Sequence, residues 1–141
     1  MSLLPPSTNS QYEGAQAAAS FLTLLAVFTI VPGLIHTFLP DGGGGVIAGL
    51  DLSHSGPTII GVFAWAGATQ VAWGTMLLVG SLRYRNLVPL LLSLVLVERT
   101  LIALNIWLLK SVGGAERPPE AYGTLVLLPL IVGALVLARR R

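Results

Sequence analysis

The sequence predicts an all-α fold: a transmembrane four-helix bundle with both termini cytoplasmic. Of its 141 residues, 54% are hydrophobic and only 10% are charged, whereas a soluble domain carries about 25% charged residues. Four apolar stretches each approach the ~20 residues that a helix needs to cross a bilayer. These runs are continuous rather than alternating, which favours helices over a β-barrel. We therefore expect one transmembrane domain over residues 1–141.

The distribution of charge predicts the orientation. Arg83 and Arg85 lie in the second connection, and three arginines, 139–141, end the chain. The first connection has no Lys or Arg but contains Asp41 and Asp51. Four crossings place the second connection and the C-terminus on one side, and the positive-inside rule makes that side cytoplasmic. The sequence thus predicts a multi-pass protein of a cell inner membrane. Because topology explains the arginines, no nucleic-acid role follows.

The first helix is expected over 15–39. Pro32 frees a backbone carbonyl and kinks a transmembrane helix, and Gly33 lets a neighbouring helix approach closely. His36 follows one turn later, near the outer interface. The glycine-rich run 40–45 then ends the helix and begins an extracytoplasmic loop.

Four side chains in and beside this loop form a candidate metal site: His36, Asp41, Asp51 and His54. Two imidazoles and two carboxylates suit zinc or another divalent cation, and one helical turn could bring Asp51 and His54 together. The glycine-rich loop does not fix the geometry of the four. Capping and interfacial hydrogen bonding are therefore the alternative interpretation, and bis-histidine haem ligation is disfavoured because both histidines lie at one interface.

The second helix is expected over 57–82 and is dense in small residues. Three of them recur at every fourth position: Ala64, Ala68 and Ala72. Such a stripe is a surface against which another helix can pack. Gln70 lies near the middle of the helix, with Trp73 one turn away. This pair either lines a pocket for a flat or lipidic ligand or fills space between helices.

The third helix, 86–109, carries Glu98 and Arg99 in the middle of an apolar run. Ionisable groups at bilayer depth cost several kcal/mol by most estimates, so they persist only when paired, solvated or used. Glu98 and Asn105 share one helix face, while Arg99 lies about 100° around the axis. Three interpretations stay open: a buried polar lock, a ligand or proton site, and an intersubunit contact. The candidate ligand-binding residues are Gln70, Trp73, Glu98, Arg99 and Asn105.

The fourth helix, 122–138, is short and nearly featureless. The chain has no cysteine, which excludes thiol–disulfide relays, thiolate metal sites and lipoprotein-type lipidation. It also has no phosphate loop, nucleophile motif or metalloprotease signature. The sequence names neither a reaction nor a cofactor, and it favours a protein that is not an enzyme.

One stretch, 56–99, resembles a known family. It begins with a helix of small residues, Phe63-Ala-Trp-Ala-Gly-Ala-Thr-Gln70-Val-Ala-Trp-Gly74, which has Gly80 near its end. A short basic turn, Arg83-Tyr-Arg85, and a leucine-rich helix follow. With Pro32-Gly33 and His36 ending the first helix, the chain resembles the DoxX-like group of small four-helix bacterial membrane proteins. Members often carry an acid in the second helix where this chain has Gln70. Some are associated with quinol-linked oxidases, so the resemblance implies a quinone-related or accessory-subunit role.

Two functions follow as expectations. The first is a non-catalytic accessory or scaffold subunit that packs beside a larger membrane complex or self-associates within the lipid bilayer. The alternative is a binder of a quinone- or isoprenoid-like molecule in a midplane pocket near Glu98 and Arg99. A cavity that reaches Glu98 favours the binder, and a dry, packed core favours the subunit.

Overall fold

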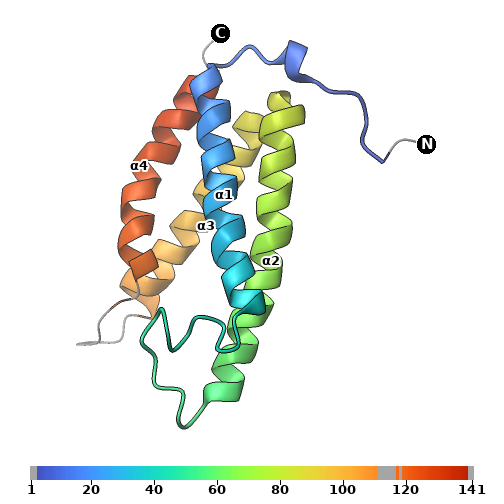
Figure 1. Cartoon of the computed structure of the whole chain (residues 1–141). Coiled ribbons are helices and arrows are strands. Elements are labelled where there is room, and N and C mark those ends of the chain that lie inside the picture. Colours follow the sequence, from blue (N-terminus) through green and yellow to red (C-terminus); the bar gives the residue numbers. More distant parts are fainter. Residues whose placement is uncertain (1–2, 111–116, 118, 140–141) are drawn as a thin grey trace. The chain divides into compact units, whose positions relative to one another are not determined.

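The computed structural model describes residues 3–110, 117 and 119–139, and this part of the chain is helical without strands (Figure 1). The long helices are α1 (Gln16–Phe38), α2 (Gly56–Arg83), α3 (Val88–Leu104) and α4 (Pro119–Arg139). Shorter helical turns are η1 (Asn9–Gln11), η2 (Arg85–Leu87) and η3 (Asn105–Leu109). The all-α prediction is confirmed, whereas the orientation of the termini stays a prediction.

The described residues include four helices long and apolar enough to cross a membrane: Gln16–Phe38, Gly56–Arg83, Arg85–Leu109 and Glu120–Arg139. The first three agree with the predicted stretches to within one residue at each end. The fourth helix begins earlier than expected, at Pro119. Proline is favoured in a first helical turn because its fixed φ suits the helix, and Glu120 there interacts favourably with the helix dipole. The chain therefore has the helices of a multi-pass membrane protein.

Residue contacts divide the chain into two compact units. The first comprises Met1–Leu22 with Gly80–Arg141, and the second comprises Thr23–Val79. The first unit thus holds the start of α1, the end of α2, and both α3 and α4. The second holds the rest of α1 and α2 with the loop between them. That the whole chain forms one domain stays a prediction.

In the first unit, α3 and α4 pack side by side (Figure 1). The buried residues of α3 recur at the three- and four-residue spacing of one helix face: Val88, Leu91, Leu92 and Val95. Those of α4 are Ala121, Thr124, Ile131, Ala134 and Ala138, and the start of α1 adds Ala18, Ala19 and Leu22. This core is built mainly from aliphatic and small side chains, as close helix packing requires.

In the second unit, glycines bring α1 and α2 together. A Cβ added to Gly33 would lie 2.9 Å from the Cβ of Gln70, and one added to Gly67 would lie 2.7 Å from the carbonyl oxygen of Gly33. One added to Gly74 would lie 3.1 Å from the carbonyl oxygen of Ala26. The two backbones are too close for side chains at these positions. The expectation that Gly33 lets a neighbouring helix approach is confirmed.

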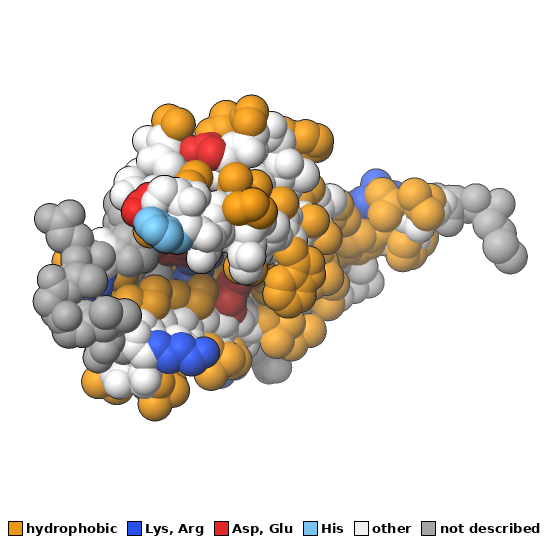
Figure 2. Space-filling view, turned by 90° about the horizontal axis from the view of Figure 1, so that it is seen from below, with side chains coloured by type: hydrophobic (Ala, Val, Ile, Leu, Met, Phe, Trp, Pro, Cys, Tyr) orange, Lys and Arg blue, Asp and Glu red, His pale blue; other side chains and the backbone are white. Residues whose placement is uncertain are grey.

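Many large apolar side chains are exposed, and Figure 2 shows such side chains on the face in view. Phe28 and Val31 of α1, Trp65 of α2 and Leu90 of α3 are examples. Isolated exposed apolar side chains are ordinary, but extended apolar faces mark contact with a membrane or a partner. The exposed faces of these helices are consistent with contact with lipid.

Candidate functional site

Arg99 lies between two carboxylates in the first unit. Its Nη1 donates to Oε1 of Glu120 over 3.0 Å, and its Nε lies 3.8 Å from Oε2 of Glu98. The Arg99 side chain is 13% exposed, against 35% for Glu98 and 51% for Glu120. The mostly buried cation therefore joins α3 to the first turn of α4.

Glu120 is the member of this ion-pair cluster that was not expected from the sequence. The sequence placed it in a connection, two residues before the fourth helix was expected to begin. Pro119 followed by an acid is a recognisable helix start and could have extended α4 to include it. Which residue of α3 it meets depends on how α3 and α4 are aligned, and neither helix carries a sequence signal for that alignment.

Asn105, a predicted ligand-binding residue, begins the π-helical turn η3. Its Nδ2 donates to the carbonyl oxygen of Leu101 over 2.8 Å, and its own carbonyl accepts from the N–H of Lys110 over 2.8 Å. The Asn105 side chain thus bonds to its own helix. Single π-turns are rare and often occur at functional sites.

Trp107 lies within η3 and faces the start of α4. Its Nε1 donates to the carbonyl oxygen of Ala121 over 3.4 Å, and its ring meets that of Tyr122 edge to face at 5.6 Å. The guanidinium of Arg117 lies 4.3 Å from the ring centre, within the range of a cation–π interaction. Trp107 therefore contacts the start of α4 at Ala121 and Tyr122, and it also contacts Arg117, which lies just before that helix.

The structure brings two of the other predicted ligand-binding residues together. Glu98 and Arg99 form the ion pair described above, in the first unit. Gln70 and Trp73 lie on α2 in the second unit, where the Cβ of Gln70 lies close to Gly33. A pocket shared by all of them stays a prediction.

Three buried polar atoms have no hydrogen-bond partner among the described residues: Gln70 Oε1, Arg99 Nε and Thr124 Oγ1. Thr124 is 1% exposed and lies one turn after Glu120 on α4. Buried polar atoms are nearly always bonded to protein or ordered water. Each of the three atoms is therefore a position where an ordered water molecule would complete the hydrogen bonding.

In the second unit, Asp41 organises the glycine-rich loop. Its carboxylate accepts N–H bonds from Val46 (2.8 Å), Gly43 (2.8 Å) and Gly45 (3.0 Å). These bonds favour the charged carboxylate and hold the pKa of Asp41 below its ordinary value. The Asp41 carboxylate therefore already accepts hydrogen bonds from the backbone of its own loop.

The remaining metal candidates are also held by local contacts. His36 Nδ1 lies 2.7 Å from the carbonyl oxygen of Gly42. The hydroxyl and N–H of Ser53 lower the pKa of Asp51, and the same hydroxyl lies 2.8 Å from His54 Nδ1. The described residues contain no group of three or more His, Cys, Asp or Glu side chains placed to hold a metal ion. The metal site inferred from sequence stays a prediction.

Comparison with protein-family models, with curated proteins and with solved structures finds no match to this chain. The resemblance to DoxX-like proteins therefore stays a prediction from sequence.

Proposed function

We propose that this protein is a non-catalytic subunit that packs, through the exposed face of α2, against a transmembrane helix of a partner membrane protein. The observation that carries the proposal is this face. Ala68 and Ala72 are exposed, and Trp65, one turn before Ala68, is 75% exposed. The predicted alanine stripe is not the surface that meets α1, because Gly67 and Gly74 occupy that side.

Small residues favour a protein helix over lipid as the occupant. Without a hydrophobic driving force between helices, association in a bilayer depends on close backbone approach, which Ala and Gly permit. The α2 span is also the least buried of the four, with 17% of its most apolar stretch buried against 39% for α1. A partner helix would cover both the alanines and Trp65.

The polar groups of the spans support a structural role. Arg99 pairs with two carboxylates of its own chain. Several hydroxyls donate to the carbonyl four residues earlier in their own helix, those of Thr29, Thr37, Thr69, Thr75, Ser93 and Thr100. Hydroxyls bonded in this way are satisfied within their own helices, as is usual for Ser and Thr in a helix interior.

Native mass spectrometry of the protein purified from its membrane in a mild detergent tests the proposal. We expect a complex of fixed stoichiometry with another membrane protein. In the double variant Ala68→Phe/Ala72→Phe this complex should dissociate. Leu125→Phe is the matched control, because Leu125 is exposed on α4. A complex that survives the double variant, or contains only copies of this chain, contradicts the proposal.

A second candidate function is binding of a lipophilic molecule with a polar head, of the quinone or isoprenoid type. It is favoured by the buried Gln70 Oε1 and Arg99 Nε, which lack hydrogen-bond partners in the described structure. A polar head group beside either atom would supply the hydrogen bond that the atom lacks. The same spectra test it: a retained small-molecule mass that Gln70→Leu removes supports binding, and a protein without any such mass contradicts it.

A further inference from the structure

The loop between α1 and α2, in the second unit, exposes aliphatic side chains. Val46 is 83% exposed, Ile47 57% and Leu50 43%. Residues 42–50, here called the apolar loop, contain no charged residue and no polar side chain. The next residues are polar and exposed: Asp51, Ser53, His54 and Ser55. Aliphatic side chains gathered on a surface in this way mark contact with a partner or a membrane.

Every backbone N–H from Gly42 to Leu50 has an acceptor within the protein. The Asp41 carboxylate accepts three of them, those of Gly43, Gly45 and Val46. The others donate to carbonyl oxygens of residues 39–45 over 2.9–3.2 Å. An N–H group that leaves water without an acceptor is costly, and lipid supplies none. The donors of the apolar loop can therefore leave water while they stay bonded.

The apolar loop is held against the first turns of α2. A Cβ added to Gly42 would lie 3.0 Å from the Cβ of Phe63, and one added to Gly44 would lie 3.6 Å from Cγ2 of Ile59. Both glycines are buried, and the carbonyl oxygen of Gly42 lies 2.7 Å from His36 Nδ1. The loop is therefore fixed beside residues 59–63 of α2.

The length of α2 sets the depth of these residues in a bilayer. At about 1.5 Å per residue, its 28 residues span about 42 Å, whereas the hydrocarbon core is about 30 Å thick. When α2 crosses upright with Arg83 at the headgroups of one face, its first two turns extend about 12 Å beyond the core at the other face. The apolar loop lies beside those turns, at the boundary between acyl chains and headgroups.

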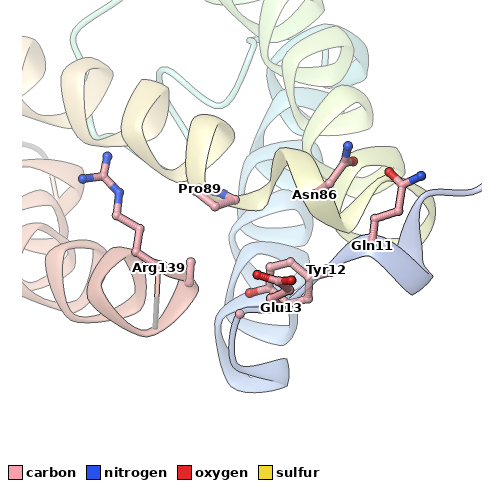
Figure 3. A pocket seen from close by; sticks show the side chains of 8 residues that line it. Gln11, Tyr12, Glu13, Asn86, Pro89 and Arg139 are labelled. Carbon is pink, nitrogen blue, oxygen red and sulfur yellow. The ribbon is translucent and has the colours of Figure 1, made fainter. Parts of the chain in front are cut away.

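The segment before α1, residues 3–15 in the first unit, is an ordered segment of a different kind. Three hydrogen bonds fix it: Tyr84 hydroxyl to Pro5 carbonyl (2.9 Å), Asn9 Nδ2 to Leu82 carbonyl (2.7 Å), and Ala15 N–H to Leu137 carbonyl (3.1 Å). With the start of α3 and the end of α4, it lines a pocket of about 250 Å³ (Figure 3).

The lining of this pocket is largely polar and includes Gln11, Glu13, Asn86 and Arg139. Side chains of these types are mostly found in contact with water. An ordered segment at the end of a candidate span is thus not necessarily apolar. Order alone does not explain the aliphatic side chains of the apolar loop.

We propose that the apolar loop inserts into the membrane–water interface, where Val46 and Ile47 contact acyl chains just below the headgroups. The occupant of this surface is lipid rather than protein. The polar residues 51–55 stay in water and limit the depth of insertion. The proposal does not depend on a partner for α2, because that contact is at Ala68 and Ala72.

Fluorescence quenching in lipid nanodiscs, where both faces of the bilayer are accessible, tests the proposal. The chain has no cysteine, so a bimane label can be attached to Val46→Cys alone. Ser55→Cys and Gln11→Cys, at exposed polar positions, are the matched controls. The Val46 label should emit at a shorter wavelength than either control. Lipids brominated near the headgroup end of their acyl chains should quench it, and iodide in the water should quench only the controls.

Two results of this experiment overturn the proposal. If iodide quenches the Val46 label as strongly as the Ser55 label, the apolar loop lies in water. If neither iodide nor brominated lipid reaches the Val46 label, protein rather than lipid covers the loop.

A substitution tests whether the aliphatic side chain drives insertion. With the label on Leu50→Cys, Val46→Gln should increase quenching by iodide and decrease quenching by brominated lipid. The variant keeps the backbone N–H that donates to Asp41. Val126→Gln is the matched control, because Val126 is 62% exposed on α4 in the first unit, and it should leave the Leu50 label unchanged. Equal effects of the two substitutions, or none from either, also overturn the proposal.

Discussion

Arg99 has two carboxylate partners where one would neutralise it. Glu120 makes the shorter contact and Glu98 the longer one, and both carboxylates are partly exposed. Partly exposed ion pairs contribute little individually, whereas a mostly buried charge left without any partner is costly. The two carboxylates should therefore act as substitutes for each other.

We predict that Glu98→Gln and Glu120→Gln each lower the free energy of unfolding by about 0.5–1 kcal/mol. The double variant should lose about 3 kcal/mol, more than the sum, because Arg99 then stays charged and buried without a carboxylate. Thermal unfolding in detergent, followed by circular dichroism, measures all three. Additive losses would show that Arg99 finds water or lipid headgroups instead.

Replacement of Arg99 by leucine completes the comparison. Arg99→Leu should destabilise the protein, and the added Glu98→Leu substitution should restore part of the loss, because an apolar pair needs no counter-charge. A double variant less stable than Arg99→Leu alone would argue against a structural lock.

How much of the site could be predicted from sequence depends on the residue. The Glu98–Arg99 pair was predictable because charged residues in an apolar run are conspicuous. Glu120 was not, because its contact with Arg99 crosses a chain reversal and depends on how two nearly featureless helices align. Asn105 shares a helix face with Glu98, but the sequence gives no sign of the π-turn in which its amide bonds to Leu101.

At the scale of the element, α2 contains two glycines in opposite surroundings. A Cβ on Gly67 would lie 2.7 Å from the Gly33 carbonyl oxygen and 2.7 Å from the His36 Cβ, whereas a Cβ on Gly61 would meet nothing within 4 Å. The two positions share one helix and differ only in what they face.

We therefore predict opposite effects of the same substitution. Gly67→Ala should destabilise the protein by about 1–3 kcal/mol, because a backbone carbonyl cannot yield as a flexible side chain can. Gly61→Ala should stabilise it by up to about 1 kcal/mol through helix propensity. Unfolding of the two variants under identical conditions measures the difference. Equal effects would mean that the close approach of α1 and α2 is absent in solution.

The Asp41 loop gives a prediction on pH. Because the folded pKa of Asp41 is below the ordinary 3.8, its contribution to stability is fully present above that value and is lost as pH falls through the folded pKa. The amide NMR signals of Gly43, Gly45 and Val46 should shift together with a midpoint below 3.8. Asp41→Asn should abolish this titration, and a wild-type midpoint at or above the ordinary value would contradict the loop geometry.

For the whole molecule, the four spans were predictable because length and hydropathy are properties of each segment alone. The arrangement of the helices was less predictable. The sequence indicated the alanines of α2 as a packing surface, yet α1 packs against the glycines on another side of α2. Two helices approach most closely through the face that carries their smallest residues. Hydropathy does not show whether that face is lined by alanine or by glycine.

The orientation is a prediction for the whole chain. A reporter fused after Arg85 should lie in the cytoplasm and one fused after Arg117 outside it, because positive charge favours the cytoplasmic side. A fusion at the C-terminus should agree with the one after Arg85. Activity assays of reporters that work on only one side of the membrane measure this, and the same side for Arg85 and Arg117 would refute four crossings.

The bonds of the N-terminal segment have a consequence for the order of assembly. Pro5 bonds to Tyr84 just after α2, Asn9 bonds to Leu82 near the end of α2, and Ala15 bonds to Leu137 near the end of α4. Each of these groups is synthesised well before its partner. The bonds of Pro5 and Asn9 can form once α2 is complete, whereas the bond of Ala15 must wait until α4 is nearly complete. The contact of this segment with α4 is therefore the last of the three to form.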